Sequence, residues 1–146
     1  MIYTKGFYNE EENYDFLSTL TIKNKNLNAL EYLHGNCQDF SIALYEEFGY
    51  PTVLWTEYDD SIENMVLIHA FNVIKQDNDI FYVDIRGITN DLNTLTSGFD
   101  YSEDISVDMK NISHTLNTLK KLGIKVGNIN IPKKIIQSYK EHYIIW

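Results

Sequence analysis

The sequence predicts an α+β fold in which helices pack on a central antiparallel sheet. Helical patterns lie toward both ends of the chain, whereas two apolar, strand-like runs, residues 65–74 and 80–85, follow each other in the middle. A short polar turn, residues 75–79, joins these two runs. Strands that are grouped between helices, instead of alternating with them, favour α+β over a doubly wound sheet. With 146 residues the chain has the size of one domain, which we place at 1–146.

The first third predicts two helices after an opening, to about residue 25, that has no clear pattern. Leu27, Leu30 and Leu33 have helical spacing, which ends at Gly35. A second helix is expected over residues 37–48. Asn36 suits its N-cap, because the side-chain oxygen can accept a backbone N–H of the first turn.

The apolar stripe of the second helix is expected to face the core, and the helix to end at Gly49. The stripe consists of Phe40, Ala43, Leu44 and Phe48. Asp39 lies in the first turn, where a negative charge favours the positive end of the helix.

Three strands are expected next. Residues 51–58 predict a short strand and residues 58–64 a polar loop. Residues 65–74 are apolar except for His69 and Asn72, so this strand is predicted to be buried on both faces. Residues 80–85 predict the third strand, which ends before Gly87.

The last third predicts two more helices. Residues 109–122 have an amphipathic pattern that stops at Gly123. Pro132 is expected in the first turn of a final helix over residues 132–146.

Charge and composition exclude some functions. The net charge is −9 and Arg86 is the only arginine, so the chain has no basic face with which to bind nucleic acid. An acidic surface suits a basic protein partner, or simply keeps the protein in solution. Oligomeric state cannot be read from the sequence.

The cysteine count and the N-terminus predict a cytoplasmic protein. Cys37 is the only cysteine, so folding needs no disulfide. Residues 1–13 have no apolar run typical of a signal peptide, and no segment has membrane-spanning length. We therefore expect no membrane partner. Delivery of the protein into a host cell stays open.

Cys37, His69 and Asp84 are the candidate catalytic residues. Cys37 opens a predicted helix, and the free N–H groups at a helix start stabilise a thiolate, which lowers the pKa of a thiol. A histidine beside the thiol can accept its proton, and an aspartate can orient the imidazole from the other side. The backbone N–H of Cys37 is also placed to help hold an oxyanion.

Strand register tests this interpretation. His69 and Asp84 can meet across a hairpin only if their side chains share a face of the sheet. Direct pairing of the two implies a four-residue connection, residues 75–78. More generally, the hypothesis predicts an even loop, or an odd loop with a bulge.

Each of the three residues also has a structural explanation. A single cysteine in a helix is most often a packing residue. A histidine in a strand is usually structural, and an aspartate before Arg-Gly commonly forms a turn or a salt bridge. The combination, in the order Cys, His, Asp, favours catalysis.

Three blocks, GNCQDFSIALYEEFGYP, HAFNV and YVDIRGI, resemble the papain-like and transglutaminase-like superfamily of cysteine enzymes. The pattern Gly-x-Cys-x-x-Phe, then His, then Asp-x-x-Gly is similar to that of small bacterial and phage proteins of this group. The match covers about residues 30–95. The resemblance implies a nucleophile at a helix N-terminus beside an antiparallel sheet, with Cys37 as nucleophile, His69 as general base and acid, and Asp84 as orienting acid.

The chain also departs from this superfamily. Papain-type enzymes carry a glutamine before the cysteine as an oxyanion donor, and no glutamine precedes Cys37 here. Asn36, Gln38 or a backbone amide are the candidates to replace it. Transglutaminases proper use calcium, and the chain has no calcium-loop pattern, so protein cross-linking is not implied.

Other residues were assigned to the surroundings of the site. Arg86 follows Asp84 by two positions. It can pair with Asp84, which would weaken the triad, or bind an acidic group of the substrate, or form a surface ion pair. Trp55 can wall the cleft or belong to the core. His34 lacks a paired-ligand spacing that would make a zinc site with His69 and Asp84. We expect no metal and no cofactor.

The sequence therefore leaves two hypotheses. The first is a cysteine-dependent hydrolase or acyltransferase that acts on an amide or isopeptide bond of a protein or peptide substrate: a peptidase, or else a deamidase or transferase. The second is a non-catalytic, acidic binding or inhibitor protein, of phage or effector type, on the same fold. An exposed Cys37 of low pKa favours the first, and a buried, inert Cys37 the second.

Overall fold

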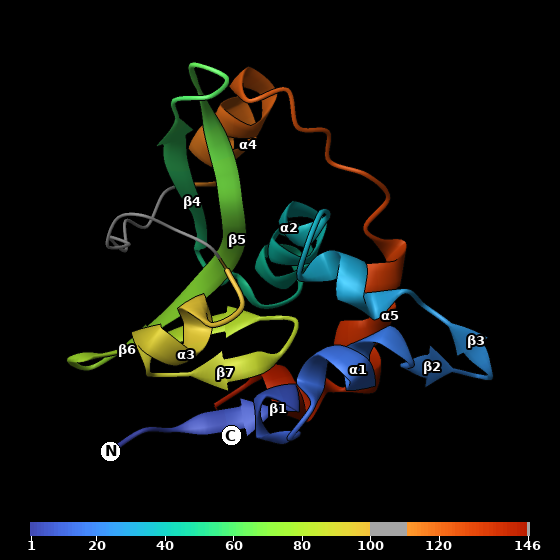
Figure 1. Ribbon diagram of the computed structural model, residues 1–146. Helices are drawn as coiled ribbons and strands as arrows, with labels where there is room; N and C mark the ends of the chain where they lie inside the picture. Colours follow the sequence, from blue (N-terminus) through green and yellow to red (C-terminus); the bar gives the residue numbers. More distant parts are fainter. Residues whose placement is uncertain (100–110, 146) are drawn as a thin grey trace.

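A computed structural model of the protein describes residues 1–99 and 111–145. Within these residues the predicted α+β class is confirmed: five antiparallel strands form one sheet in the order β1-β7-β6-β5-β4, with helices around it (Figure 1). The strands of this sheet are β1 (Thr4–Gly6), β4 (Thr52–Asp59), β5 (Asn64–Gln76), β6 (Asp79–Asp84) and β7 (Gly87–Thr89). A separate two-stranded ladder pairs β2 (Thr21–Ile22) with β3 (Lys25–Asn26).

In the chain, the helices come before β4 and after β7. The α-helices are α1 (Asn13–Ser18), α2 (Cys37–Phe48), α3 (Leu92–Thr96), α4 (Ile112–Lys121) and α5 (Asn130–Ser138). Short 3₁₀ helices cover Phe7–Asn9, Ala29–Tyr32 and Lys140–Tyr143.

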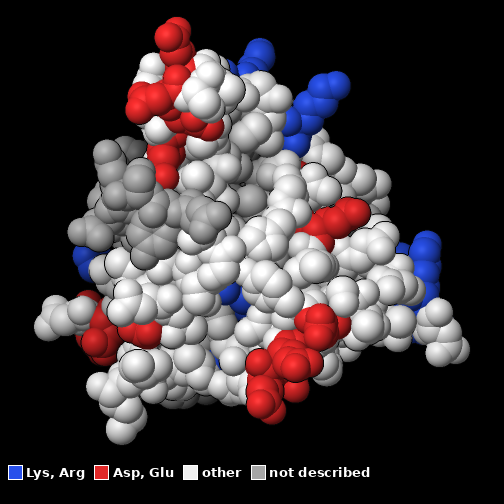
Figure 2. All heavy atoms as spheres, viewed as in Figure 1, with Lys and Arg blue, Asp and Glu red and all other residues white. Residues whose placement is uncertain are grey.

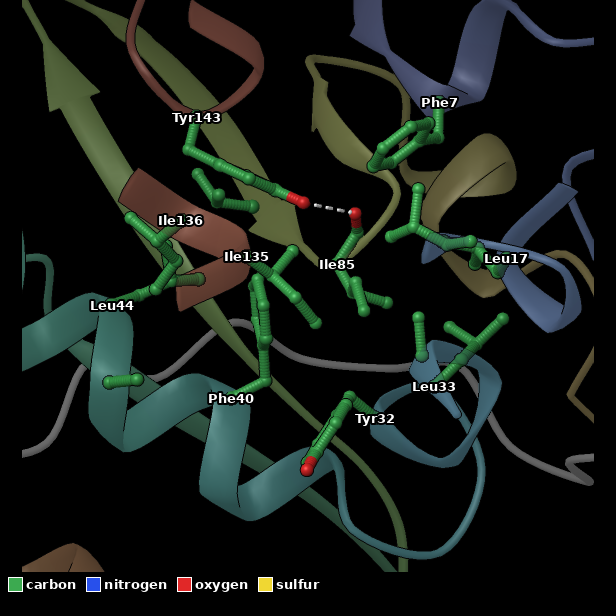
Figure 3. Packing of buried hydrophobic residues seen from close by; sticks show 14 of the residues in the cluster. Phe7, Leu17, Tyr32, Leu33, Phe40, Leu44, Ile85, Ile135, Ile136 and Tyr143 are labelled. Carbon is green, nitrogen blue, oxygen red and sulfur yellow. Dashed lines mark hydrogen bonds between the residues drawn. The ribbon is translucent and has the colours of Figure 1, made fainter. Parts of the chain in front are cut away.

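The main core lies between α2, α5 and one face of the sheet. The predicted stripe of α2 supplies Phe40, Ala43 and Leu44, which are all buried. They pack with side chains of α5 and with Tyr143, as Figure 3 shows. The Tyr143 hydroxyl donates a 2.8 Å hydrogen bond to the Ile85 carbonyl, which ties the C-terminal segment to the end of β6.

A smaller apolar cluster covers the other face of the sheet. It consists of Val53 and Trp55 from β4, Phe71 and Val73 from β5, Tyr82 from β6 and Leu95 from α3. Because side chains alternate along a strand, His69 belongs to this face with Phe71 and Val73, while Ala70 and Asn72 belong to the face of α2. Every residue from His69 to Val73 is buried, which confirms burial on both faces there. The prediction is wrong for residues 65–68, which are exposed or half-buried.

Several boundaries differ from the prediction. The helix expected around Leu27–Leu33 is only the 3₁₀ helix Ala29–Tyr32. The final helix ends at Ser138 instead of continuing to residue 146, and a 3₁₀ helix follows it after Tyr139. Pro132 is in its first turn, as predicted. The predicted helix 109–122 is present as α4 from Ile112 to Lys121; residues 109 and 110 lie outside the described residues.

Strands β1 and β7 were not predicted, and Gly87 explains how they approach each other. Gly87 has a φ of 124°, and a Cβ at this position would overlap the Lys5 carbonyl oxygen of β1. Only glycine permits both the backbone angle and the contact. With β1 seated on β7, the Tyr8 N–H donates to the Arg86 carbonyl at 2.8 Å. The start of the chain is thereby fixed beside the end of β6.

In the described part of the chain, no helix combines the length and the apolar character needed to cross a membrane.

Candidate active site

Cys37 is the first residue of α2 and is only 5% exposed. Asn36 is the N-cap residue, as predicted, but the expected side-chain cap is wrong: the side chain makes no capping hydrogen bond and its Nδ2 lies 3.5 Å from Glu31 Oε2. The first-turn N–H groups of α2 are therefore left without this side-chain acceptor. That leaves them free to face the thiol.

The thiol is enclosed by polar groups of the main chain and by Gln38. The Ala70 N–H donates to Sγ at 3.3 Å. The thiol in turn donates toward Gln38 Oε1, which lies 3.9 Å from Sγ. Burial raises the pKa of Cys37 to about 11, although the N–H groups of Ala70, Cys37 and Gln38 act in the opposite direction. The expected lowering of this pKa is thus wrong, because loss of solvent outweighs the helix N-terminus.

Gln38 is fixed by a second contact. Its Nε2 donates to the Lys125 carbonyl at 3.2 Å, so both ends of the amide have a partner. Gln38 therefore lies beside the thiol, as predicted for a site residue, while its donor group is occupied by the segment that follows α4.

His69 is fully buried and is held by Asp84. Its Nε2 lies 3.0 Å from Asp84 Oδ2. Because an ionised carboxylate only accepts hydrogen bonds, Nε2 carries the proton and Nδ1 of the neutral ring presents a lone pair. Burial lowers the pKa of His69 and keeps it neutral, although Asp84 acts in the opposite direction. Nδ1 is buried and has no hydrogen-bond partner among the described residues.

Arg86 neutralises Asp84. Its Nη2 lies 2.7 Å from Asp84 Oδ2, and its Nε lies 3.1 Å from the same oxygen. Burial by itself raises the pKa of Asp84, but the Arg86 guanidinium and the His69 hydrogen bond outweigh it and hold this pKa well below its usual range. The hypothesis of a surface ion pair is wrong, since Arg86 is 1% exposed.

Arg86 also has no donor left for a substrate. Nη1 donates to the Ser97 carbonyl at 3.1 Å, and Nη2 to the Leu95 carbonyl at 2.6 Å. Recognition of an acidic substrate group by Arg86 is therefore excluded in this arrangement. The residue holds α3 and Asp84 together.

The hairpin between β5 and β6 brings His69 and Asp84 to one face by an even loop, as predicted, but in another register. Gln76 pairs with Asp79, so the turn is Asp77–Asn78 and not residues 75–78. The ladder runs back to the pair Asn72–Val83. Extended by one position, this register sets Asp84 opposite residue 71, so His69 and Asp84 are diagonal neighbours on the same face.

A bulge precedes His69. Trp55 of β4 pairs with His69, but the next residue of β4 pairs with Leu67, so Ile68 is the extra residue. Bulges of this kind bend a strand and change the aim of the side chains beside them. Trp55 itself is buried in the small apolar cluster, so the core interpretation of this residue is confirmed.

The structure brings His69 and Asp84 into direct contact, while Cys37 meets Ala70, the residue that follows His69 in β5. The link to Cys37 is the main chain of β5, through the Ala70 N–H; Sγ and His69 are not hydrogen-bonded to each other. Proton transfer from the thiol to Nδ1 therefore requires a rearrangement that brings Sγ and Nδ1 within hydrogen-bond distance.

Two residues of the site were missed by sequence reasoning. The Tyr8 hydroxyl donates to Asp84 Oδ1 at 3.1 Å, and the Arg86 guanidinium lies 4.7 Å from the centre of the Tyr8 ring. Phe99 covers His69 with a distance of 4.3 Å between ring centres. Neither residue lies in a recognisable motif, and Tyr8 is 76 positions from Asp84 in the chain.

His34 does not join a metal site with these residues. Its Nε2 lies 3.1 Å from the Tyr14 hydroxyl, and the side chain is exposed. Within residues 1–99 and 111–145, no group of three or more His, Cys, Asp or Glu side chains is arranged to hold a metal ion.

Comparisons with known proteins give no relative: no protein-family model, no curated protein and no solved structure matches the chain.

The reactive groups of the site are the neutral thiol of Cys37 and the neutral imidazole of His69. Nε2 of this imidazole is bonded to the Asp84 carboxylate. The carboxylate is in turn neutralised by a buried guanidinium. Once Sγ and Nδ1 come within hydrogen-bond distance, these groups have the chemistry to move a proton from sulfur to nitrogen as the sulfur attacks a carbonyl carbon.

Proposed function

We propose that the protein is a cysteine-dependent hydrolase or acyltransferase that acts on an amide or isopeptide bond, with a core of the papain-like or transglutaminase-like type. The observation that carries the proposal is the buried His69, which bonds Asp84 through Nε2 and leaves Nδ1 without a partner among the described residues. The Nδ1 atom of His142 is also buried without a partner, so the bond of Nε2 to the buried Asp84 is what distinguishes His69. A lone-pair-bearing nitrogen on a ring that a carboxylate holds in place is suited to a general base.

In the proposed reaction Cys37 Sγ attacks the carbonyl carbon of the substrate while its proton passes to His69 Nδ1. The oxyanion is held by first-turn N–H groups of α2, those of Cys37 and Gln38, which already face the sulfur. His69 then gives the proton to the departing amine, the C–N bond breaks, and an acyl-thioenzyme remains. Attack by water, with His69 again as base, releases the acid and restores the thiol.

Deamidation and acyl transfer to an amine use the same intermediate. Ammonia leaves in the first case, and an amine replaces water in the second. A protein or peptide is the proposed substrate class for all three reactions.

A non-catalytic binding protein is the second candidate, and one observation favours it. Cys37 is 5% exposed and its pKa is raised to about 11, as expected of an inert packing residue. The net charge of −9 suits a basic partner, and Figure 2 shows Asp and Glu side chains gathered in clusters on one face of the molecule.

The pH dependence of Cys37 alkylation by iodoacetamide separates the two candidates. For an enzyme, we expect the rate to rise as His69 loses its proton and to stay high through neutral pH. The His69→Ala variant is expected to lose this step and to react only on the alkaline limb, toward pH 11. Since Cys37 is the only thiol, the rate needs no assignment to a site.

The control is His114→Ala, which removes an exposed histidine of α4. It is expected to leave the profile of the wild type unchanged. If the wild type and His69→Ala both react only on the alkaline limb, the enzyme proposal is wrong and the binding protein takes its place.

A further inference from the structure

A pocket of about 330 Å³ opens beside the thiol. Its walls come from three parts of the chain: the start of α2 with Cys37, residues 64–68 of β5 together with Ile62, and the residues Leu122 and Ile124 that follow α4. At this volume, the low end of the range for ligand pockets, it can take one large side chain and a short length of main chain.

The pocket wall is mostly apolar, with Gln38 and Asn64 as its polar side chains. Ile62 and Met65 line it with 58% and 40% of their surfaces exposed, and Leu122 and Ile124 line it as half-buried residues. Among the described residues that line it, none carries a charge. A charged side chain that entered would lose water without gaining an ion pair, so the lining selects against charge.

The pocket also follows a free edge of β5. Strand β5 pairs with β4 along residues 64–72, but with β6 only from Asn72 to Gln76, and Figure 1 shows β5 extending past β6 toward α4. Side chains alternate between the two faces of a strand, so a pocket lined by the consecutive residues 64–68 runs along the strand edge. Here the Met65 N–H donates to Oδ1 of the neighbouring Asn64, at 2.8 Å.

This edge leads to the nucleophile. At Ala70, further along β5, the backbone N–H points to Cys37 Sγ instead of to a strand. Free N–H and C=O groups at a sheet edge bind an extended chain by adding it as a further strand. A chain bound beside residues 64–68 would therefore bring its own carbonyl group to the thiol.

We infer that the substrate of Cys37 is an extended peptide that lies along the free edge of β5 and places an uncharged, apolar side chain in this pocket, an inference that rests on the proposed function. Ile62, Met65, Leu122 and Ile124 are then the specificity-determining residues. The side chain that they recognise belongs to the acyl portion of the substrate, close to the bond that is cleaved.

The test uses peptidyl chloromethyl ketones that carry leucine, or its near-isostere aspartate, at the first, second or third residue from the reactive group. Alkylation forms the S–C bond at Cys37, breaks the C–Cl bond and releases chloride, while the thiol proton passes to the base. Each rate constant is divided by that of iodoacetamide with the same variant. At one of the three positions we expect leucine to react at least tenfold faster than aspartate.

Met65→Asp places a charge in the pocket and is expected to reduce this preference at least tenfold. Leu116→Asp is the matched control, because Leu116 is 42% exposed, on α4, and does not line the pocket. It is expected to keep the preference of the wild type.

The outcomes distinguish the inference from the function on which it rests. Equal rates for leucine and aspartate at all three positions, or a preference that survives Met65→Asp, overturn the inference even where iodoacetamide reacts in a His69-dependent way. If no reagent reacts below pH 8, both the inference and the proposed function are wrong.

Discussion

Arg86 determines the charge balance of the candidate site. Its guanidinium makes two contacts to Asp84 Oδ2, at 2.7 and 3.1 Å, in a place where both side chains are almost completely buried. Without the Arg86 side chain, a carboxylate would remain in the core with His69, Tyr8 and the backbone N–H of residue 86 as its partners among the described residues, and with no positive charge to balance it. Buried ion pairs add little net stability, but removing one partner of such a pair is costly.

Arg86→Met is therefore expected to lower the free energy of unfolding by roughly 3–5 kcal/mol at pH 7. Because Arg86 lowers the pKa of His69 alongside the effect of burial, its loss is also expected to move the His69-dependent step of Cys37 alkylation to higher pH. Urea denaturation measures the first effect and the alkylation profile the second.

Lys133→Met is the control for this substitution, since it removes the same charge from a partly exposed ion pair with Glu46. We expect it to cost less than about 1 kcal/mol. Equal losses for the two variants would contradict the role given to Arg86.

At the residue scale, the sequence predicted those site residues that lie within a clear helix or strand pattern. Cys37, His69 and Asp84 could be named because each is a polar residue at a defined place in a strongly patterned helix or strand. The contact of Tyr8 with Asp84 could not, since it depends on where the first strand docks. The pKa of Cys37 was predicted in the wrong direction because burial depends on the whole fold, whereas the helix start is local.

Among the elements, α2 and the last helix show which boundaries a sequence defines. Helix α2 was predicted from start to end because it begins after Asn36 and stops at Gly49, which has the left-handed φ of 75°. Helix α5 has no such stop, and it gives way to a 3₁₀ helix where Tyr143 turns inward to reach the Ile85 carbonyl. That tertiary hydrogen bond leaves no trace in the local pattern.

The junction of β1 and β7 depends on Gly87. In Gly87→Ala, the new Cβ would meet the Lys5 carbonyl oxygen at a backbone φ of 124°. We expect a loss of roughly 3 kcal/mol or more in the free energy of unfolding, from the strained backbone and from displacement of β1. Urea denaturation is the measurement.

Gly123→Ala separates strain from displacement. Gly123 also has a positive φ, 74°, but nothing lies within 4 Å of a Cβ built there, so only the backbone cost of about 1 kcal/mol is expected. Losses of equal size at the two glycines would show that β1 is not seated on β7 as described.

The whole molecule is expected to be most stable around neutral pH. Burial lowers the pKa of His69, and Arg86 and His69 outweigh burial to hold that of Asp84 well below its usual range. A group whose folded pKa is depressed adds stability above its unfolded pKa, and this stability is lost as the pH falls. The loss is therefore expected to begin near pH 6.5 with His69 and to grow below about pH 4 with Asp84.

Cys37 contributes in the opposite direction. Burial raises its pKa to about 11, so its contribution is complete below the pKa of an unfolded thiol and is lost as the pH rises from about 8.5 to 11. Unfolding of the wild type and of Cys37→Ala across this range measures the effect. The difference in stability between them is expected to shrink by roughly 2 kcal/mol, and a constant difference would mean that the thiol is not enclosed.

The turn between β6 and β7 is held by both ends of the chain: the Tyr8 N–H donates to the Arg86 carbonyl, and the Tyr143 hydroxyl donates to the Ile85 carbonyl, each at 2.8 Å. During synthesis Tyr8 emerges from the ribosome early and Tyr143 almost last. The hydrogen bond from Tyr143 to the turn that follows Asp84 can therefore form only after residue 143 has been synthesised. A nascent chain that stalls before this point contains the cysteine, the histidine and the aspartate, but lacks the frame that seats them.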